Sequence, residues 1–220
     1  MSKTKKFDIH VHSYYSDGIN SPAELVSYAK KLGLDGIAIT DHNEIKGTLE
    51  AMKFQEDGFL VIPGIEISAR EGHIIALGIS EVIPGRLSAE ETVKRIHELG
   101  GIAIAAHPYD FFRGGVGDLV LKINFDAVEV ENGHTVHSKK KMLDFAKKNN
   151  LPISGGSDAH CLEELGVVII EIPEKYESPI DAIKNRDLQV VSKMSKIKIL
   201  KNFLKRRFKD SKKILQSEDE

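Results

Sequence analysis

Five of the nine histidines lie at, or within two residues of, the carboxyl end of a short apolar run that is typical of a β-strand. They are His10, His12, His42, His107 and His160. In α/β folds, binding and catalytic sites are built at the carboxyl ends of the strands. His10 and His12 are two residues apart, so both imidazoles project from the same face of one strand. This distribution predicts one polar site at the strand ends.

Carboxylates follow the same apolar runs. Asp17 comes just beyond the first run, Glu66 follows the third, and Asp158 precedes His160 by two residues. Imidazole nitrogens and carboxylate oxygens from several strand ends form a set that binds Zn²⁺, Mn²⁺ or Fe²⁺, and a carboxylate can bridge two ions. Without metal, so many buried acids would be difficult to keep ionised. The pattern therefore favours a metal centre.

The other histidines carry weaker signals. His73 opens an apolar run instead of closing one, so its position fits a metal ligand and a partly exposed strand residue equally well. His97 lies inside a predicted helix, where a solvated or boundary histidine is the default. His134 and His137 follow a strand end, so we expect them near the mouth of the site but outside the ligand set.

The sequence motifs of two kinds of metal-free site are absent from this chain. A serine esterase needs a Gly-x-Ser-x-Gly turn, and residues 155–158, GGSD, lack the second flanking glycine. A dinucleotide site needs Gly-x-Gly-x-x-Gly, which residues 114–117, GGVG, do not supply. That segment instead allows the backbone to approach an anion, with Arg113 beside it as a candidate phosphate contact. The alternative for Arg113 is a surface arginine in a flexible loop.

Positioning these side chains requires strands that alternate with helices. Apolar runs predict strands at residues 7–11, 36–40, 60–62, 73–79, 102–106, 127–130, 151–154 and 167–172. Amphipathic stretches predict helices at residues 21–32, 45–56, 88–100, 137–149 and 179–185. Ser21 and Glu24 form a capping box at the start of the first helix. Strands that are apolar on both faces indicate parallel pairing under helices, hence a doubly wound sheet or an α/β barrel.

The composition indicates a single domain in a reducing compartment. With 220 residues and 41% hydrophobic content, the chain can build one good-sized core. A net charge of −2 gives the whole chain no electrostatic reason to coat nucleic acid or an anionic membrane. No secretory segment and no run of 18 apolar residues is present, so we expect a cytoplasmic protein without a membrane span. The single cysteine, Cys161, excludes an intramolecular disulfide.

The charge changes sharply near residue 193. Residues 193–220 hold ten Lys or Arg and four acids, a net charge of +6, whereas residues 1–192 carry −8. Apolar residues of this tail recur at helical spacing: Ile197, Leu200, Leu204, Phe208 and Leu215. We predict a catalytic unit at 1–192 and a basic amphipathic helix at 193–220. Packing of its apolar stripe on the catalytic unit is favoured over nucleic-acid binding, because charged helical faces are usually solvated.

Six segments, in order along the chain, resemble the polymerase and histidinol phosphatase (PHP) family. They are FDIHVHS at 7–13, SDG at 16–18, TDH at 40–42, GIEIS at 64–68, AHP at 106–108 and GSDAH at 156–160. The joint match is far more specific than any one segment. The resemblance implies an α/β fold, a distorted (β/α)7 barrel in a single domain, with two or three divalent metal ions at the carboxyl ends of the strands.

The same resemblance implies which side chains bind the ions. It places His10, His12, Glu66 and Asp158 on one ion, Glu66, His73 and His107 on a second, and Asp17, His42 and His160 on a third. Residues 73–78, HIIALG, match a strand that carries a ligand histidine in the family, which favours His73 as a ligand. Asp8 and Asp41 are expected to orient ligand imidazoles. The implied reaction is phosphoester hydrolysis by a hydroxide held between metal ions.

The form of the second segment bears on the substrate. Histidinol phosphatases of the family usually place a histidine where this chain has Asp17, whereas the SDG form resembles nucleoside 3′,5′-bisphosphate phosphatases and 5′-to-3′ exonucleases. That branch often has a helical insertion after the strand with His73, yet only 33 residues separate His73 from His107 here. We expect a phosphorylated small molecule, a nucleotide or a short nucleic acid as substrate, cleaved as a phosphomonoester or phosphodiester.

Three alternatives remain open at this point. A histidinol-phosphatase-like enzyme would act on a small phosphate ester with the same metal centre. An amidohydrolase commonly bridges its two ions with a modified lysine, and the strand ends of this chain offer Glu66 and histidines but no lysine. A non-catalytic PHP module would normally have lost ligands, whereas all nine expected ligand positions here hold competent residue types.

Overall fold

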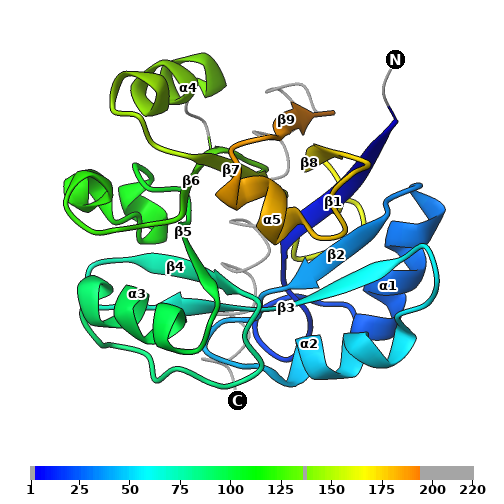
Figure 1. Cartoon of the computed structure of the whole chain (residues 1–220). Coiled ribbons are helices and arrows are strands. Elements are labelled where there is room, and N and C mark those ends of the chain that lie inside the picture. Colours follow the sequence, from blue (N-terminus) through cyan, green and yellow to red (C-terminus); the bar gives the residue numbers. More distant parts are fainter. Residues whose placement is uncertain (1–2, 136–137, 194–220) are drawn as a thin grey trace, which may run out of the picture.

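The computed structural model describes residues 3–135 and 138–193. The strands within these residues form one nine-stranded sheet. The predicted tail helix, from residue 194 onward, and His137 lie outside these residues. The strands are β1 (Thr4–Val11), β2 (Gly36–Ile39), β3 (Leu60–Ser68), β4 (His73–Leu77), β5 (Ile102–Ala105), β6 (Ala127–Asn132), β7 (Ile153–Gly156), β8 (Val168–Pro173) and β9 (Gln189–Ser192). Their order in the sheet is β7-β6-β5-β4-β3-β2-β1-β8-β9. In Figure 1 the strands curl into a nearly closed ring.

The ring closes between β7 and β1. Val11, the last residue of β1, forms a parallel bridge with Ala159, and the backbone N–H of His12 donates to the carbonyl of Ala159 at 2.8 Å. The two strands approach so closely that a Cβ on Gly156 would lie 2.4 Å from the Cβ of His10. The predicted α/β barrel is therefore confirmed. The described residues contain nine strands, two more than the resemblance implies.

The strand directions differ from an all-parallel barrel. The pairs β1–β2, β2–β3, β5–β6 and β6–β7 are parallel, whereas β4 is antiparallel to both neighbours and β8 is antiparallel to β1 and β9. Only residues 69–72 connect β3 to β4, and so short a connection cannot carry the chain back for a parallel pairing. The expectation of uniformly parallel strands was therefore wrong at β4 and β8, and β9, which pairs antiparallel with β8, lies outside the strands predicted from the sequence.

Helices connect most of the strands. They are α1 (Pro22–Lys31), α2 (Lys46–Ala51), α3 (Ala89–Glu98), α4 (Lys139–Lys148) and α5 (Pro179–Lys184), with 3-10 turns η1 (Met52–Phe54), η2 (Phe111–Arg113) and η3 (Gly117–Leu121). The predicted capping box of α1 is confirmed, since Ser21 Oγ accepts from the N–H of Glu24 and the Glu24 carboxylate accepts from the N–H of Ser21. None of the described helices is long and apolar enough to cross a membrane. Helices α1, α2 and α3 lie outside the ring in Figure 1.

Strand β1 shows how alternation separates core from site. From position 7 onward its residues with odd numbers are Phe7, Ile9 and Val11, which join the two apolar clusters of the molecule. Its residues with even numbers carry polar side chains, and Asp8 and His10 are fully buried between them, as is His12 just after the strand. Because alternate side chains of a strand point to opposite faces, one short segment supplies both packing and chemistry.

Strands β3 and β4 carry two predicted site residues, of which Glu66 lies differently from the sequence analysis and His73 opens its strand as predicted. Glu66 was expected after a strand that ends at Ile62, but β3 continues to Ser68 through Pro63, because residues 64–68 pair with β4. Glu66 thus lies inside the strand. His73 opens β4 and pairs with Ser68. Since β4 runs opposite to its neighbours, its amino end meets the carboxyl ends of the parallel strands, and His73 reaches the same edge as the other histidines.

Candidate metal centre

Glu66 is the hub of a buried cluster of imidazoles. Its side chain is 1% exposed, and its two oxygens face five histidines, which lie on β1 and β4 and in the segments just after β1, β2 and β5. Oε2 lies 3.3 Å from each of three nitrogens, His10 Nε2, His12 Nε2 and His42 Nδ1. Oε1 lies 3.2 Å from His73 Nδ1 and 3.5 Å from His107 Nε2. One carboxylate therefore joins two sets of imidazoles.

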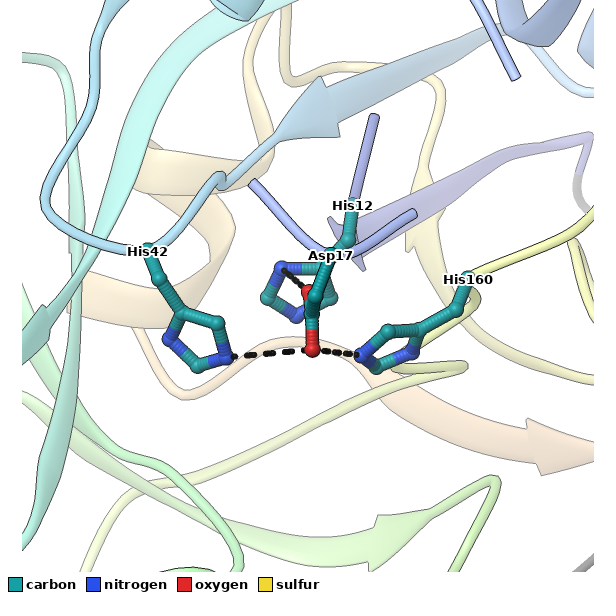
Figure 2. Close-up of side chains that lie close together, drawn as sticks. All are labelled: His12, Asp17, His42 and His160. Atoms are coloured by element: carbon teal, nitrogen blue, oxygen red, sulfur yellow. Dashed lines mark hydrogen bonds and ion pairs between the residues drawn. The ribbon is translucent and has the colours of Figure 1, made fainter. Parts of the chain in front are cut away.

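A second carboxylate, Asp17, closes the cluster on the side of His160. Asp17 Oδ2 lies 3.0 Å from His160 Nε2 and 3.8 Å from His42 Nε2, and Asp17 Oδ1 lies 3.6 Å from His12 Nδ1. Figure 2 shows the three imidazoles arranged around this carboxylate. Asp17 is half exposed, whereas His12 is fully buried, so this group reaches from the barrel interior toward solvent.

Asp158 divides its two oxygens between the imidazoles and Arg113. Oδ1 lies 3.2 Å from His12 Nε2 and 3.6 Å from His10 Nε2. Oδ2 accepts from Arg113 of the η2 turn and, at 3.1 Å, from Asn132 Nδ2. The backbone of Asp158 is left-handed, with φ of 54°, a conformation that non-glycine residues adopt rarely and mostly where surrounding contacts enforce it. The structure thus brings all nine predicted ligand residues and Arg113 together.

The electrostatics of the cluster favour bound cations. Burial opposes ionisation of Glu66, but His10 and its neighbours hold the pKa of Glu66 well below its ordinary value. Burial opposes protonation of His12, but Asp158 and Glu66 outweigh it and raise the pKa of His12 to about 9. Burial lowers the pKa of His42 to about 4, which keeps that imidazole neutral. The carboxylates therefore stay anionic, and a metal ion would replace the proton on His12.

Several buried atoms of the cluster lack hydrogen-bond partners, which is the feature a metal ion would satisfy. Within the described part of the chain they are His10 Nε2, both ring nitrogens of His12, His42 Nδ1, Glu66 Oε1 and His107 Nδ1. Ligand atoms bound at 2.0–2.1 Å around one tetrahedral ion lie roughly 3.3 Å apart. The spacings of 3.2–3.5 Å around Glu66 match that separation. The donor set and its spacing therefore fit divalent metal ions.

The possible ligand atoms gather into overlapping groups. Atoms within 4.8 Å of one another come from His12, Asp17, His42 and His160, from His10, His12 and Glu66, and from His42, Glu66 and His73. All of the proposed ligands except His10 and His12 line a cavity of about 410 Å³, together with Phe112, Arg113 and Gly114. A small phosphate ester fits in such a space beside the ligands.

The sequence pattern of the family described as PHP domain matches residues 8–217 of the chain. The chain belongs to the PHP domain family.

Three comparisons describe the relatives of this PHP domain. An uncharacterized protein of Methanocaldococcus jannaschii is 40% identical over 141 residues, 59% of this chain and 82% of that protein. A 5′-3′ exoribonuclease of Haemophilus influenzae is 38% identical over 106 residues, 46% of this chain and 39% of that protein. A solved structure from Bacteroides vulgatus, a two-domain protein containing a predicted PHP-like metal-dependent phosphoesterase, has a TM-score of 0.74 and 23% identity. That match covers 87% of this chain and 65% of the other, and at this identity it supports the fold alone.

Glu129 is a site residue of this PHP domain that the sequence analysis missed. It lies on β6, is 3% exposed, and contacts His10 Nδ1 at 2.9 Å through Oε1. Its Oε2 accepts from the backbone N–H of His107 at 2.8 Å and from Asn132 Nδ2 at 3.1 Å. The available signal was an acid between Val128 and Val130 in the middle of an apolar strand. A carboxylate in that position is buried and needs donors.

The expected roles of Asp8 and Asp41 were wrong. Their described hydrogen bonds go to backbone and serine groups instead of ligand imidazoles. Asp8 accepts from the N–H groups of Ser157 at 3.0 Å and Gly166 at 2.8 Å, and burial raises its pKa to about 6. Asp41 accepts from Ser13 N at 2.7 Å and Ser13 Oγ at 2.6 Å. Both acids therefore hold the backbone that carries the ligands.

Two further histidines of the PHP domain have described contacts. His134 is buried, with Nε2 2.9 Å from the carbonyl oxygen of Asp158 and 3.4 Å from Glu164 Oε2. His134, His160 and Glu164 form a further group of possible ligand atoms beside the nine predicted ligands. His97 on α3 contacts Asp126 at 2.7 Å and belongs to none of these groups among the described residues.

Proposed function

We propose that this PHP domain is a phosphoesterase that depends on two or three divalent ions, Mn²⁺, Zn²⁺ or Fe²⁺. One observation carries the proposal: buried nitrogen and oxygen atoms without hydrogen-bond partners converge on Glu66 at the spacing of metal ligands. The proposed ligands are His10, His12, Asp17, His42, Glu66, His73, His107, Asp158 and His160. Membership of the PHP domain family supports a hydrolase, and the cluster supports its dependence on metal.

Divalent ions at this site would lower the pKa of water and offset the negative charge that develops on the phosphate oxygens during displacement. The side chains of this PHP domain hold the arrangement that the reaction needs. Glu66 presents one oxygen to each of two imidazole sets, and Glu129 fixes the orientation of His10. No side chain has to act as a covalent nucleophile.

Arg113 is the proposed phosphate contact. Two of the five N–H groups of its guanidinium are directed to Asp158 and to Asn132 Oδ1, the latter at 3.1 Å. Arg113 lines the cavity beside the proposed ligands, so its remaining N–H groups are available to a phosphate oxygen. The pair with Asp158 also raises the pKa of the guanidinium against the effect of burial, which keeps the cation in place.

We propose a nucleotide or an oligonucleotide-like phosphoester as the substrate. The SDG segment around Asp17 and the similarity to a 5′-3′ exoribonuclease of Haemophilus influenzae favour this class. A histidinol-phosphatase-like activity would use the same centre on a smaller ester.

Two measurements test the proposal together. Protein purified without chelator is analysed for metals, and we expect more than one ion per chain, because nine ligand side chains exceed the needs of one ion. A panel of phosphomonoesters, cyclic phosphodiesters, 3′,5′-bisphosphates and short RNA and DNA is then assayed with added Mn²⁺. At most one ion after reconstitution would refute the polynuclear centre, and hydrolysis of none of these phosphoesters would refute the proposed activity.

A further inference from the structure

Phe112 is an apolar side chain in an unusual place. It is fully exposed, at 104% of the reference area, and it lines the cavity above the proposed metal centre. Among the described residues that line this cavity, Phe112 is the only hydrophobic side chain, since the others are imidazoles, carboxylates, Arg113 and Gly114. A phenyl ring that is exposed to water at the rim of a polar cavity is not stabilised by burial within the protein. A bound ligand is therefore the candidate for covering this ring.

The backbone that carries Phe112 is anchored by the site. The next residue, Arg113, pairs with Asp158, and its backbone N–H donates to the carbonyl of Asp110 at 3.1 Å. The following residue, Gly114, is left-handed with φ of 73°, and its carbonyl accepts from the N–H of His73 at 2.7 Å. The ring of Phe112 is therefore presented from a turn whose next two residues are fixed to the proposed metal ligands Asp158 and His73.

The neighbouring Phe111 provides a contrast. It is also exposed, at 74%, but it does not line the cavity. Its ring lies over the next turn, where Phe111 Cε1 would be 3.5 Å from a Cβ placed on Gly117. The two phenylalanines have the same chemistry and belong to the same 3-10 turn, and only Phe112 faces the space that a substrate would occupy.

We infer that Phe112 stacks on a nucleobase that is attached to the phosphate held at the metal centre. This inference rests on the proposed function and names its substrate class. With the phosphate beside Arg113 and the ions, the adjoining part of the ester reaches the rim, where Phe112 offers a flat apolar face. Bases bind aromatic side chains in this way with little dependence on sequence, because every base has a π-face. A phosphate ester of a plain sugar has no π-face to stack on the phenyl ring.

The test compares ligands with and without a base. Full-length protein loaded with Mn²⁺ is titrated with adenosine monophosphate, with a 5′-phosphorylated tetranucleotide and with ribose 5-phosphate, and hydrolysis of each is measured in parallel. Phe112→Ala should weaken binding of at least one base-carrying ligand by roughly tenfold and leave ribose 5-phosphate unchanged. Phe112→Trp should restore the binding, and the matched control Phe111→Ala should change neither class.

Each outcome decides the inference. If Phe112→Ala weakens binding of adenosine monophosphate, the base belongs to a mononucleotide. If it weakens binding of the tetranucleotide alone, the base belongs to the end of a strand. Equal losses for ribose 5-phosphate and the base-carrying ligands, no loss for either, or full retention in Phe112→Leu would refute stacking. If the wild-type protein bound the ligands but hydrolysed none, the proposed function would fail while the binding comparison still decided the role of Phe112.

Discussion

Replacing Glu129 by glutamine tests whether the acid behind the proposed ligands controls metal affinity. Glu129 contacts His10 Nδ1 and accepts from the N–H of His107 and from Asn132 Nδ2. The contact with His10 requires the ring proton on Nδ1, which makes Nε2 the nitrogen that can bind a metal ion. Glutamine keeps the volume but offers only one oxygen, so its amide group must turn an N–H toward one of these donors.

The size of the effect follows from this geometry. Removing a hydrogen-bond partner of a ligand lowers metal affinity roughly 10- to 100-fold, or about 1.4–2.7 kcal/mol. A buried donor that loses its acceptor lowers the free energy of unfolding by about 1–3 kcal/mol. Glu129 is 3% exposed, so water does not supply the missing acceptor. Metal affinity and stability of the metal-free protein should therefore decrease together.

The assay is a competition between the protein and a fluorescent chelator for Zn²⁺ or Mn²⁺, combined with urea unfolding of the metal-free protein. Glu131→Gln is the matched control, because Glu131 belongs to the same strand but contacts Lys139 at 3.7 Å. It should leave metal affinity within about twofold. Wild-type metal affinity in folded Glu129→Gln protein would refute the reasoning.

Three further predictions concern charge, pH and the basic tail. Glu66→Gln and Asp158→Asn should each lower turnover by roughly a thousandfold or more while the fold, checked by circular dichroism, persists, whereas His97→Ala should have almost no effect on turnover. Burial raises the pKa of Asp8 from 3.8 to about 6, so the folded protein keeps a proton that the unfolded chain releases at lower pH. The resulting contribution to the free energy of unfolding, about 3 kcal/mol, is fully present below about pH 4 and is lost as the pH rises through 6. Asp8→Asn should remove that pH dependence in unfolding experiments, and an unchanged slope would contradict it. Deleting residues 194–220 should lower the melting temperature and affect small and oligonucleotide substrates alike, whereas a flatter salt dependence for oligonucleotides alone would favour nucleic-acid binding by the tail.

Much of the candidate site could be predicted because it depends on local rules. Alternation along β1 placed His10 and His12 on one face, and the carboxyl ends of parallel strands collected His42, His107 and His160. These rules need only the approximate position of each strand. The fold class followed from the same pattern, since alternating strands and helices allow few architectures.

The remainder depended on pairing that the sequence does not display. The direction of β4 decides that His73 reaches the site, and the pairing of β3 with β4 carries Glu66 into a strand past Pro63. Glu129 was missed because its importance comes from His10, which is 119 positions away along the chain. Such contacts arise from closure of the barrel, which local periodicity cannot report.

Closure of the barrel has a consequence for the order of folding. His10 and His12 come from the first strand, whereas Asp158 and His160 follow β7, and Asp8 accepts from Ser157 and Gly166 across 149 and 158 positions. Contacts between such distant residues carry a large loop-closure entropy and form slowly. During synthesis, a chain that has not yet reached residue 158 lacks two of the nine proposed ligands, Asp158 and His160. Tight binding of metal at the proposed centre would therefore signal that the barrel has closed, and such ions would stabilise only chains that have finished folding.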